Sequence, residues 1–161
     1  MDQVDVVAAQ GFAETTVRVR YAETDQMGVV YHANYLVWFE VGRVEFMRQA
    51  GLAYRDMERD EGALIAVIEA RARYKAPARY DDEIVVRTAL ASVRGSMIRF
   101  TYSIYRAGEA NTVLCEGETV HIVVGRDMKR RALPERYAEH FRRLLGSRLT
   151  IDVYASESAG E

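Results

Sequence analysis

The chain has 161 residues, of which 49% are hydrophobic and 29% are charged, and its formal net charge at pH 7 is -2. A chain of this length can bury about two thirds of the surface that its unfolded state exposes, so it can fold as one domain without disulfides. The composition excludes a disordered or collagen-like protein, and the small net charge argues against general nucleic-acid binding. No stretch approaches the roughly eighteen apolar residues of a membrane span.

Cys115 is the only cysteine, which excludes an intramolecular disulfide and leaves no spacing typical of a metal site. We expect it in the core, and a reducing compartment is its natural setting. The first twelve residues have neither a basic start nor an apolar run, unlike a secretory signal. The sequence therefore predicts a cytoplasmic protein without a membrane span or a bound metal.

The first part of the chain predicts one strand and one long helix. Residues before about Glu14 carry no strong period, whereas 16–21 alternate apolar and charged side chains like a half-buried strand. A helix is predicted over 33–50, because Gly51 suits a left-handed helix end. Its apolar residues cover well over half of its circumference: Leu36, Val37, Trp38, Phe39, Val41, Val44, Phe46, Met47 and Ala50. This coverage indicates burial on most sides, as in a helix wrapped by a sheet.

Four extended segments follow, over 63–74, 83–93, 96–106 and 111–124. Turn signals separate them, at Pro77, at Arg94-Gly95 and at Ala107-Gly108-Glu109. Short links imply antiparallel neighbours, and the alternation along the third segment predicts one face packed on the helix.

The last predicted element is a helix from Pro134 to Leu145 that ends at Gly146 and is followed by a frayed tail. The order of elements predicts an α+β fold in which a curved antiparallel sheet wraps one long central helix and a C-terminal helix follows. We expect a single domain over 1–161, with its core at about 14–146. An exposed sheet edge would need covering, which dimerisation would achieve.

The segment over 21–35 carries the candidate chemistry. Asp25 lies seven residues before His32, at which the long apolar helix opens. Gly28 permits an unusual backbone turn, and the helix start would present unpaired amide donors. That geometry suits attack on a polarised carbonyl. The alternative is a helix-start loop in which Asp25 and Asn34 only satisfy local backbone groups.

These features resemble the hotdog-fold acyl-CoA thioesterases of the 4-hydroxybenzoyl-CoA thioesterase family, in its branch of bacterial acyl-CoA thioester hydrolases. The densest part of the resemblance runs from Arg20 to Arg43 and includes Tyr21, Thr24, Asp25, Gly28, Val29, Val30, Tyr31, His32, Asn34, Tyr35, Phe39 and Glu40. A weaker part follows at Tyr74, Pro77, Ala78 and the turn Asp81-Asp82, where the family carries a Tyr-x-x-Pro-Ala motif. The resemblance implies a hotdog fold and hydrolysis of an acyl-CoA by a homodimer or homotetramer.

The resemblance also implies roles for individual residues. Asp25 would act as nucleophile or as general base, and both possibilities stay open. The backbone amide at His32 would donate to the thioester oxygen, while the His32 imidazole would either assist or only shape the pocket. Residues expected to bind substrate beside them are Gly28, Val29, Tyr31 and Asn34. For Asn34 the competing role is ordinary helix capping, which we favour.

The nucleotide end of coenzyme A is expected on a group of basic residues, Arg94, Lys129, Arg130 and Arg131, with Arg126 beside them. Phosphates favour such groups, although a solvated charged turn is the alternative. No cofactor is implied, because coenzyme A is part of the substrate and a thiolate is already a good leaving group. An acyl or aromatic pocket could use Tyr31, Tyr35, Trp38 and Phe39, or these aromatics could belong to the core or to a dimer interface.

The remaining polar residues are assigned structural roles. Glu40 and Arg43 point into the apolar arc of the helix, where three-residue spacing permits a mutual ion pair. Glu23 is expected to be a solvated residue at a strand end. His121, in a strand, and His140, in the last helix, have no ligand-like neighbours in the sequence.

Other functions are less consistent with these residues. A dehydratase or hydratase of the same fold pairs a histidine with an acid in a sequence context that this chain lacks. An acyl-thioester binding module without efficient turnover is disfavoured because Asp25 is present. The chain contains neither the Gly-x-Ser-x-Gly turn of serine hydrolases nor the His-Glu-x-x-His pattern of zinc hydrolases.

Overall fold

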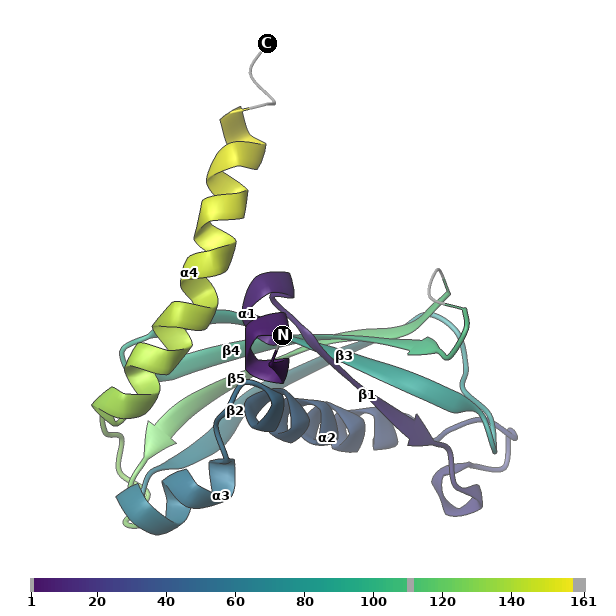
Figure 1. Cartoon of the computed structure of the whole chain (residues 1–161). Helices are drawn as coiled ribbons and strands as arrows, with labels where there is room; N and C mark the ends of the chain where they lie inside the picture. The colour runs from purple at the N-terminus through teal and green to yellow at the C-terminus, as the bar shows by residue number, and fades with distance from the viewer. Residues whose placement is uncertain (1, 110–111, 158–161) are drawn as a thin grey trace.

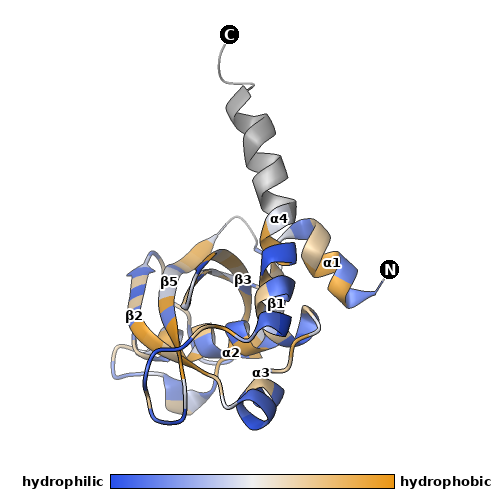
Figure 2. Ribbon diagram, turned by 90° about the vertical axis from the view of Figure 1, so that its left-hand side faces the viewer, coloured by the Kyte–Doolittle hydropathy of each residue, from blue (hydrophilic) through white to orange (hydrophobic). Residues whose placement is uncertain are grey.

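The structure is a computed structural model that describes residues 2–109 and 112–157. Five strands form one antiparallel sheet in the order β1-β3-β4-β5-β2. They are β1 (Ala13–Arg18), β2 (Leu64–Tyr74), β3 (Glu83–Arg94), β4 (Met97–Arg106) and β5 (Val113–Val124). The sheet curves around the central helix α2 (Asn34–Gln49), as Figures 1 and 2 show from two sides.

The predicted central helix and the four later strands are confirmed to within about two residues at each described end. Gly51 follows α2 with a φ of 83°, the left-handed conformation that the sequence predicts. The predicted start of the last strand at Asn111 lies outside the described residues. The first strand runs over Ala13–Arg18 instead of 16–21, because residues Tyr21–Glu23 form a short 3-10 helix, η1.

Besides η1, two further helical segments were not predicted. Helix α1 (Gln3–Gln10) packs on α4 and α2, with Val7 buried, and ends at Gly11 in the left-handed conformation. Helix α3 (Tyr54–Asp56) continues into a π-helical turn, η2 (Met57–Glu61). Both lack the repeated apolar spacing that identifies α2, so tertiary packing rather than local periodicity stabilises them.

The predicted end of the last helix is wrong. Helix α4 runs over Glu135–Glu157, past Gly146, and projects from the body of the molecule in Figure 1. Gly146 is not among the glycines with positive φ, so it continues the helix instead of terminating it. A glycine inside a helix costs only about 1 kcal/mol relative to alanine, which the surrounding turns can offset. The predicted frayed tail overlaps this helix, and residues 158–161 lie outside the described chain. No helix in the described residues is long and apolar enough to cross a membrane.

Helix α2 lies unusually close to the sheet at two glycines. A Cβ at Gly42 would lie 2.5 Å from Thr88 Oγ1 and 2.7 Å from Val86 Cγ1. A Cβ at Gly117, on β5, would lie 2.7 Å from the backbone oxygen of Arg71 and against the Phe39 ring. The absence of both Cβ atoms therefore lets the helix and sheet approach closely.

The described residues leave one face of α2 partly exposed. The buried residues of the helix are Tyr35, Trp38, Phe39, Gly42, Phe46 and Met47. On the other side, Leu36, Val37 and Val41 are 40%, 51% and 40% exposed. The expected burial on most sides is therefore wrong for a single chain, because the sheet wraps only part of the helix circumference.

Candidate active site

Asp25 sits in a four-residue turn that its own carboxylate helps to close. Thr24 pairs with Val30, and the Asp25 N–H donates to the Val29 oxygen at 2.9 Å. Gly28 donates to the Asp25 carbonyl at 3.0 Å and has a φ of 75°, which glycine adopts without strain. The Met27 N–H donates to Asp25 Oδ1 at 2.9 Å. Asp25 Oδ2 has no hydrogen-bond or ion-pair partner in the described residues, so it is available to a substrate or water.

Glu23 holds this loop in place from the core. The expectation that Glu23 is a solvated residue at a strand end is therefore wrong. Its side chain is 5% exposed and accepts hydrogen bonds from the Arg20 N–H at 2.8 Å and from Trp38 Nε1 at 3.1 Å. Its backbone oxygen accepts from the Tyr31 N–H at 2.9 Å and from Asn34 Nδ2 at 2.8 Å. Glu23 therefore fixes both the start of the Asp25 turn and the segment that leads into α2.

The start of α2 leaves amide donors free. The N-cap is Ala33, which has no side chain able to cap, so the predicted capping role of Asn34 is wrong. Asn34 instead ties the loop to the helix through Glu23. Neither the His32 N–H nor the Ala33 N–H has an acceptor within residues 2–109 and 112–157. Free amides at a helix start, aided by the helix dipole, can stabilise a developing negative charge.

A pocket of about 320 Å³ joins the turn and the helix start. Its lining residues are Asp25, Met27, Val29, Val30, His32, Tyr35, Tyr74, Lys75, Ala76 and Pro77. Of the residues to which the sequence analysis assigned catalysis or substrate binding beside Asp25, only Val29 and His32 line the pocket with Asp25. Gly28 shapes the turn, Asn34 points to Glu23, and Tyr31 lies outside the lining, with its ring centroid 4.5 Å from that of His32.

One wall of the pocket is the segment over 74–77, which the sequence analysis placed in the resemblance without assigning it a role in the site. The Val30 N–H donates to the Ala78 oxygen at 2.8 Å, and the Ala78 N–H donates to Tyr35 Oη at 3.1 Å. Tyr74 Oη donates to the His32 oxygen at 2.9 Å. The Tyr-x-x-Pro-Ala resemblance was the available signal for this wall, but local sequence gave no reason to place it against His32.

Burial keeps two phenols at the pocket and one neighbouring thiol protonated. Loss of solvent is the main cause that raises the pKa of Tyr35 and of Tyr74, so both phenols keep their protons near neutral pH. Burial also raises the pKa of Cys115, which pairs with Tyr74 across β5 and β2, to about 11. Its thiol therefore stays protonated and is a poor nucleophile.

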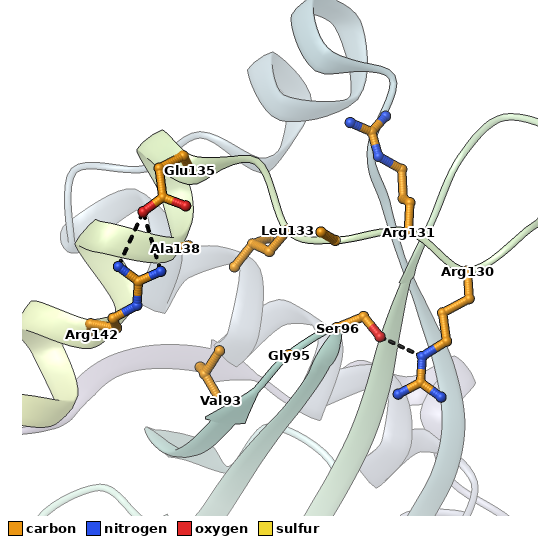
Figure 3. Close-up of a pocket in the computed structure, with 10 residues that line it drawn as sticks. Val93, Gly95, Ser96, Arg130, Arg131, Leu133, Glu135, Ala138 and Arg142 are labelled. Atoms are coloured by element: carbon orange, nitrogen blue, oxygen red, sulfur yellow. Dashed lines mark hydrogen bonds and ion pairs between the residues drawn. The ribbon is translucent and has the colours of Figure 1, made fainter.

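The basic residues predicted to bind coenzyme A gather at a different place. Arg94, Lys129, Arg130 and Arg131 are all exposed near the turn between β3 and β4. Arg130 and Arg131 line a cavity of about 600 Å³ between this turn and α4, shown in Figure 3. Arg130 Nε donates to Ser96 Oγ, and Arg131 Nη1 donates to the Glu61 oxygen at 3.0 Å.

The segments that line this basic cavity and those that line the Asp25 pocket lie at opposite ends of the sheet, as the course of the backbone in Figure 1 shows. Arg130 of the basic cavity pairs with Val124, and Val124 pairs with Leu64, so this cavity lies at the start of β2. Tyr74, which lines the Asp25 pocket, is the last residue of the same strand. The eleven residues of β2 rise by about 3.3 Å each, so roughly 30 Å separate the two ends. Within one chain the structure does not bring the two predicted groups together.

The other polar residues contribute to the structure. No ion pair joins Glu40 and Arg43 in the described part of the chain, so that prediction is wrong; Arg43 Nη1 donates to Tyr102 Oη at 3.1 Å. His121 is fully buried with its Nε2 2.8 Å from Thr119 Oγ1, and His140 Nε2 bonds to the Ala50 oxygen. Neither histidine lines the Asp25 pocket.

Trp38 and Phe39 belong to the core, and Phe39 stacks on Tyr102 with ring centroids 4.4 Å apart. Of the aromatics proposed for an acyl pocket, only Tyr35 lines the Asp25 pocket. Among the residues that the structure describes, no three His, Cys, Asp or Glu side chains are grouped so as to hold a metal ion.

Comparison with known proteins gives consistent matches. The sequence model described as the thioesterase-like superfamily matches residues 19–142. The protein YneP of Bacillus subtilis is 43% identical over 112 residues, which are 69% of this chain and 78% of that protein. The acyl-CoA thioester hydrolase YbgC of Escherichia coli is 37% identical over 127 residues, or 78% of this chain and 92% of that protein. The crystal structure of a DHNA-CoA thioesterase from Staphylococcus aureus superposes with a TM-score of 0.75 at 30% identity, covering 93% of this chain and 95% of that one. The curved sheet around one helix is the hotdog fold that the resemblance implied.

Proposed function

This chain belongs to the thioesterase-like superfamily, and from that membership we propose how its residues hydrolyse an acyl-CoA thioester to a free acid and coenzyme A. The observation that carries the assignment of residues is a single pocket lined by both Asp25, whose Oδ2 has no partner in the described residues, and His32, whose N–H has no acceptor there. A carboxylate and an amide donor are the two groups that attack on a thioester carbonyl requires.

Asp25 promotes attack on the thioester carbonyl by one of two routes. As general base, Oδ2 takes a proton from water, whose oxygen attacks the carbonyl carbon. As nucleophile, Oδ2 attacks that carbon itself and forms an acyl anhydride, which water then cleaves. In both routes the C–S bond breaks and coenzyme A leaves as its thiolate. The hydrogen bond from Met27 to Oδ1 holds the carboxylate in one orientation throughout.

The His32 N–H stabilises the oxyanion that forms on the thioester oxygen. A preorganised donor of this kind is worth about 10²–10³ in rate in enzymes where one has been removed. The reaction needs no further cofactor, because the thiolate is a good leaving group. The lone buried Cys115 favours a reducing, cytoplasmic setting for the enzyme.

Asp25→Asn is the direct test, because the amide oxygen can still accept from Met27 and keep the turn closed. We expect thiol release from a panel of aliphatic and aromatic acyl-CoAs to fall by about 10²–10⁴. Asp5→Asn, an exposed acid on α1, is the matched control and is expected to leave the rate unchanged. If the Asp25→Asn enzyme and its parent release thiol at equal rates, the assignment of Asp25 is wrong.

Coenzyme A binding is proposed to require two copies of the chain. Among the described residues, the edge strand β2 has no partner on its outer side, and Val67 and Ile68 on it are 51% and 52% exposed. These residues and the exposed Leu36, Val37 and Val41 of α2 give apolar surface that a second copy would cover. Figure 2 shows β2 at the open edge of the sheet.

A two-fold axis beside β2 would explain the separation of the two sites. Two copies of β2 paired antiparallel place the end of one strand, at Tyr74, beside the start of the other, at Leu64. The basic cavity of the second copy, around Arg130, would then approach the Asp25 pocket of the first. We propose that the thioester binds at Asp25 of one copy and that the coenzyme A phosphates bind Arg94, Lys129, Arg130 and Arg131 of the other.

A further inference from the structure

We propose that Tyr74 is a positioning residue whose hydroxyl holds the His32 carbonyl and thereby aims the His32 N–H at the thioester oxygen. This inference rests on the proposed function of the Asp25 pocket. Tyr74 is the last residue of β2 and lies 42 residues from His32 in the sequence, yet its Oη is 2.9 Å from the His32 oxygen.

The His32 N–H has no acceptor in the described residues, although its own peptide group is held through the Tyr31 oxygen, which accepts from the Asn34 N–H at 3.0 Å. The peptide groups on both sides of it are held as well. Before it, the Tyr31 N–H donates to the Glu23 oxygen at 2.9 Å. After it, the His32 oxygen accepts from Tyr74 Oη at 2.9 Å and from the Tyr35 N–H at a long 3.4 Å. The tyrosine hydroxyl therefore makes the shorter of these two hydrogen bonds, and its loss would leave the His32 carbonyl with the weaker one.

The first turn of α2 needs such an external restraint. Its N-cap, Ala33, offers no side-chain oxygen, so the turn lacks the usual capping hydrogen bond. The Tyr74 ring contacts the same turn, with its centroid 5.2 Å from that of Tyr35 and 6.2 Å from that of His32. Ring and hydroxyl together thus link the end of β2 to the start of the helix.

The hydroxyl is suited to a permanent donor role. Because burial raises the pKa of Tyr74, the phenol stays protonated through the neutral range. The residue is nevertheless 46% exposed, and β2 is held to β5 by its own backbone ladder. Removal of the Tyr74 hydroxyl alone should therefore shift the His32 amide while changing the stability of the fold little.

Tyr74→Phe keeps the ring and removes the hydroxyl. We expect kcat for acyl-CoA hydrolysis to fall about tenfold, with KM and Tm close to those of the parent. Tyr80→Phe is the matched control: it makes the same chemical change on an exposed tyrosine outside the pocket and is expected to change nothing. A kcat within twofold of the parent overturns the proposal, and so does a loss of kcat that is matched by a fall in Tm.

A spectroscopic measurement separates positioning from a general structural effect. In the Asp25→Asn background, an acyl-CoA can be bound while turnover is suppressed, and the stretching frequency of its thioester carbonyl reports the donor at the oxygen. We expect addition of Tyr74→Phe to move this band toward the frequency of the free thioester. An unchanged band overturns the proposal. If the Asp25→Asn enzyme itself retains full activity, the proposed function of the pocket fails, whatever Tyr74→Phe does.

Discussion

The indole Nε1 of Trp38 donates a hydrogen bond to the carboxylate of Glu23 at 3.1 Å, and both side chains are buried. This contact joins the second turn of the central helix to the base of the Asp25 loop. A buried carboxylate is costly unless its oxygens are hydrogen-bonded, and Glu23 meets that condition with Trp38, the Arg20 N–H and Arg20 Nε. The loop that presents Asp25 is therefore anchored in the core.

Glu23→Ala is expected to lower the free energy of unfolding by about 2–4 kcal/mol, because it leaves the Trp38 and Arg20 donors without an acceptor. Glu23→Gln, which keeps one acceptor oxygen, should cost less. Denaturant unfolding measures both, with the exposed Glu139→Ala on α4 as control. Equal stability of the Glu23→Ala variant and the parent would contradict the anchoring role.

Gly117→Ala is expected to destabilise the protein by about 1–3 kcal/mol, because the added methyl meets the Arg71 backbone oxygen and the Phe39 ring. Gly146→Ala provides a control of opposite sign. A Cβ there would meet nothing within 4 Å, and alanine favours the helix by about 1 kcal/mol. Thermal unfolding should therefore give a lower Tm for the first variant and a higher Tm for the second; a neutral Gly117→Ala would argue against the close contact.

Acidification is expected to destabilise the fold through His121. Burial, with a smaller contribution from Arg43, lowers the pKa of this imidazole to about 3. Between about pH 6.5 and 3 the unfolded chain therefore binds a proton that the folded chain does not, so stability falls as pH falls. The loss approaches about 1.4 kcal/mol per pH unit. His121→Gln should remove this part of the slope when unfolding is measured from pH 7 to 5, and an unchanged slope would show that His121 does not cause it.

Mixed dimers are expected to restore activity if each active site uses both copies. Asp25→Asn removes the carboxylate, and Arg130→Ala should raise KM about tenfold or more by removing a phosphate-binding group. A dimer with one chain of each kind would contain one intact site, so its kcat/KM should approach half that of the parent. Separately tagged chains allow its purification, and light scattering compares its mass with two chains of 18.3 kDa. A kcat/KM no higher than the average of the values for the two variants would mean that both groups act within one chain, or that they do not act together.

Several features were already decided by local sequence. The apolar residues of the central helix and Gly51 at its end predicted α2. The alternation of apolar and polar side chains, with short turns between segments, predicted the four antiparallel strands that follow. The turn at Gly28 also followed from its residue type, since a positive φ is unstrained only without a Cβ. Local sequence did not reveal α1, which lacks a strong period, and it could not distinguish Gly146 from a helix end.

What the sequence determined alone is the set of main elements, the hotdog resemblance and the position of Asp25 before a helix start. Only the tertiary structure decided the burial of Glu23, the pocket wall formed by residues 74–77 and the separation of the basic cavity from Asp25. The physical reason is distance along the chain. Periodicity acts between residues a few positions apart, whereas the hydrogen bonds that build the pocket join Trp38 to Glu23, Tyr74 to His32 and Ala78 to Tyr35 across 15, 42 and 43 residues.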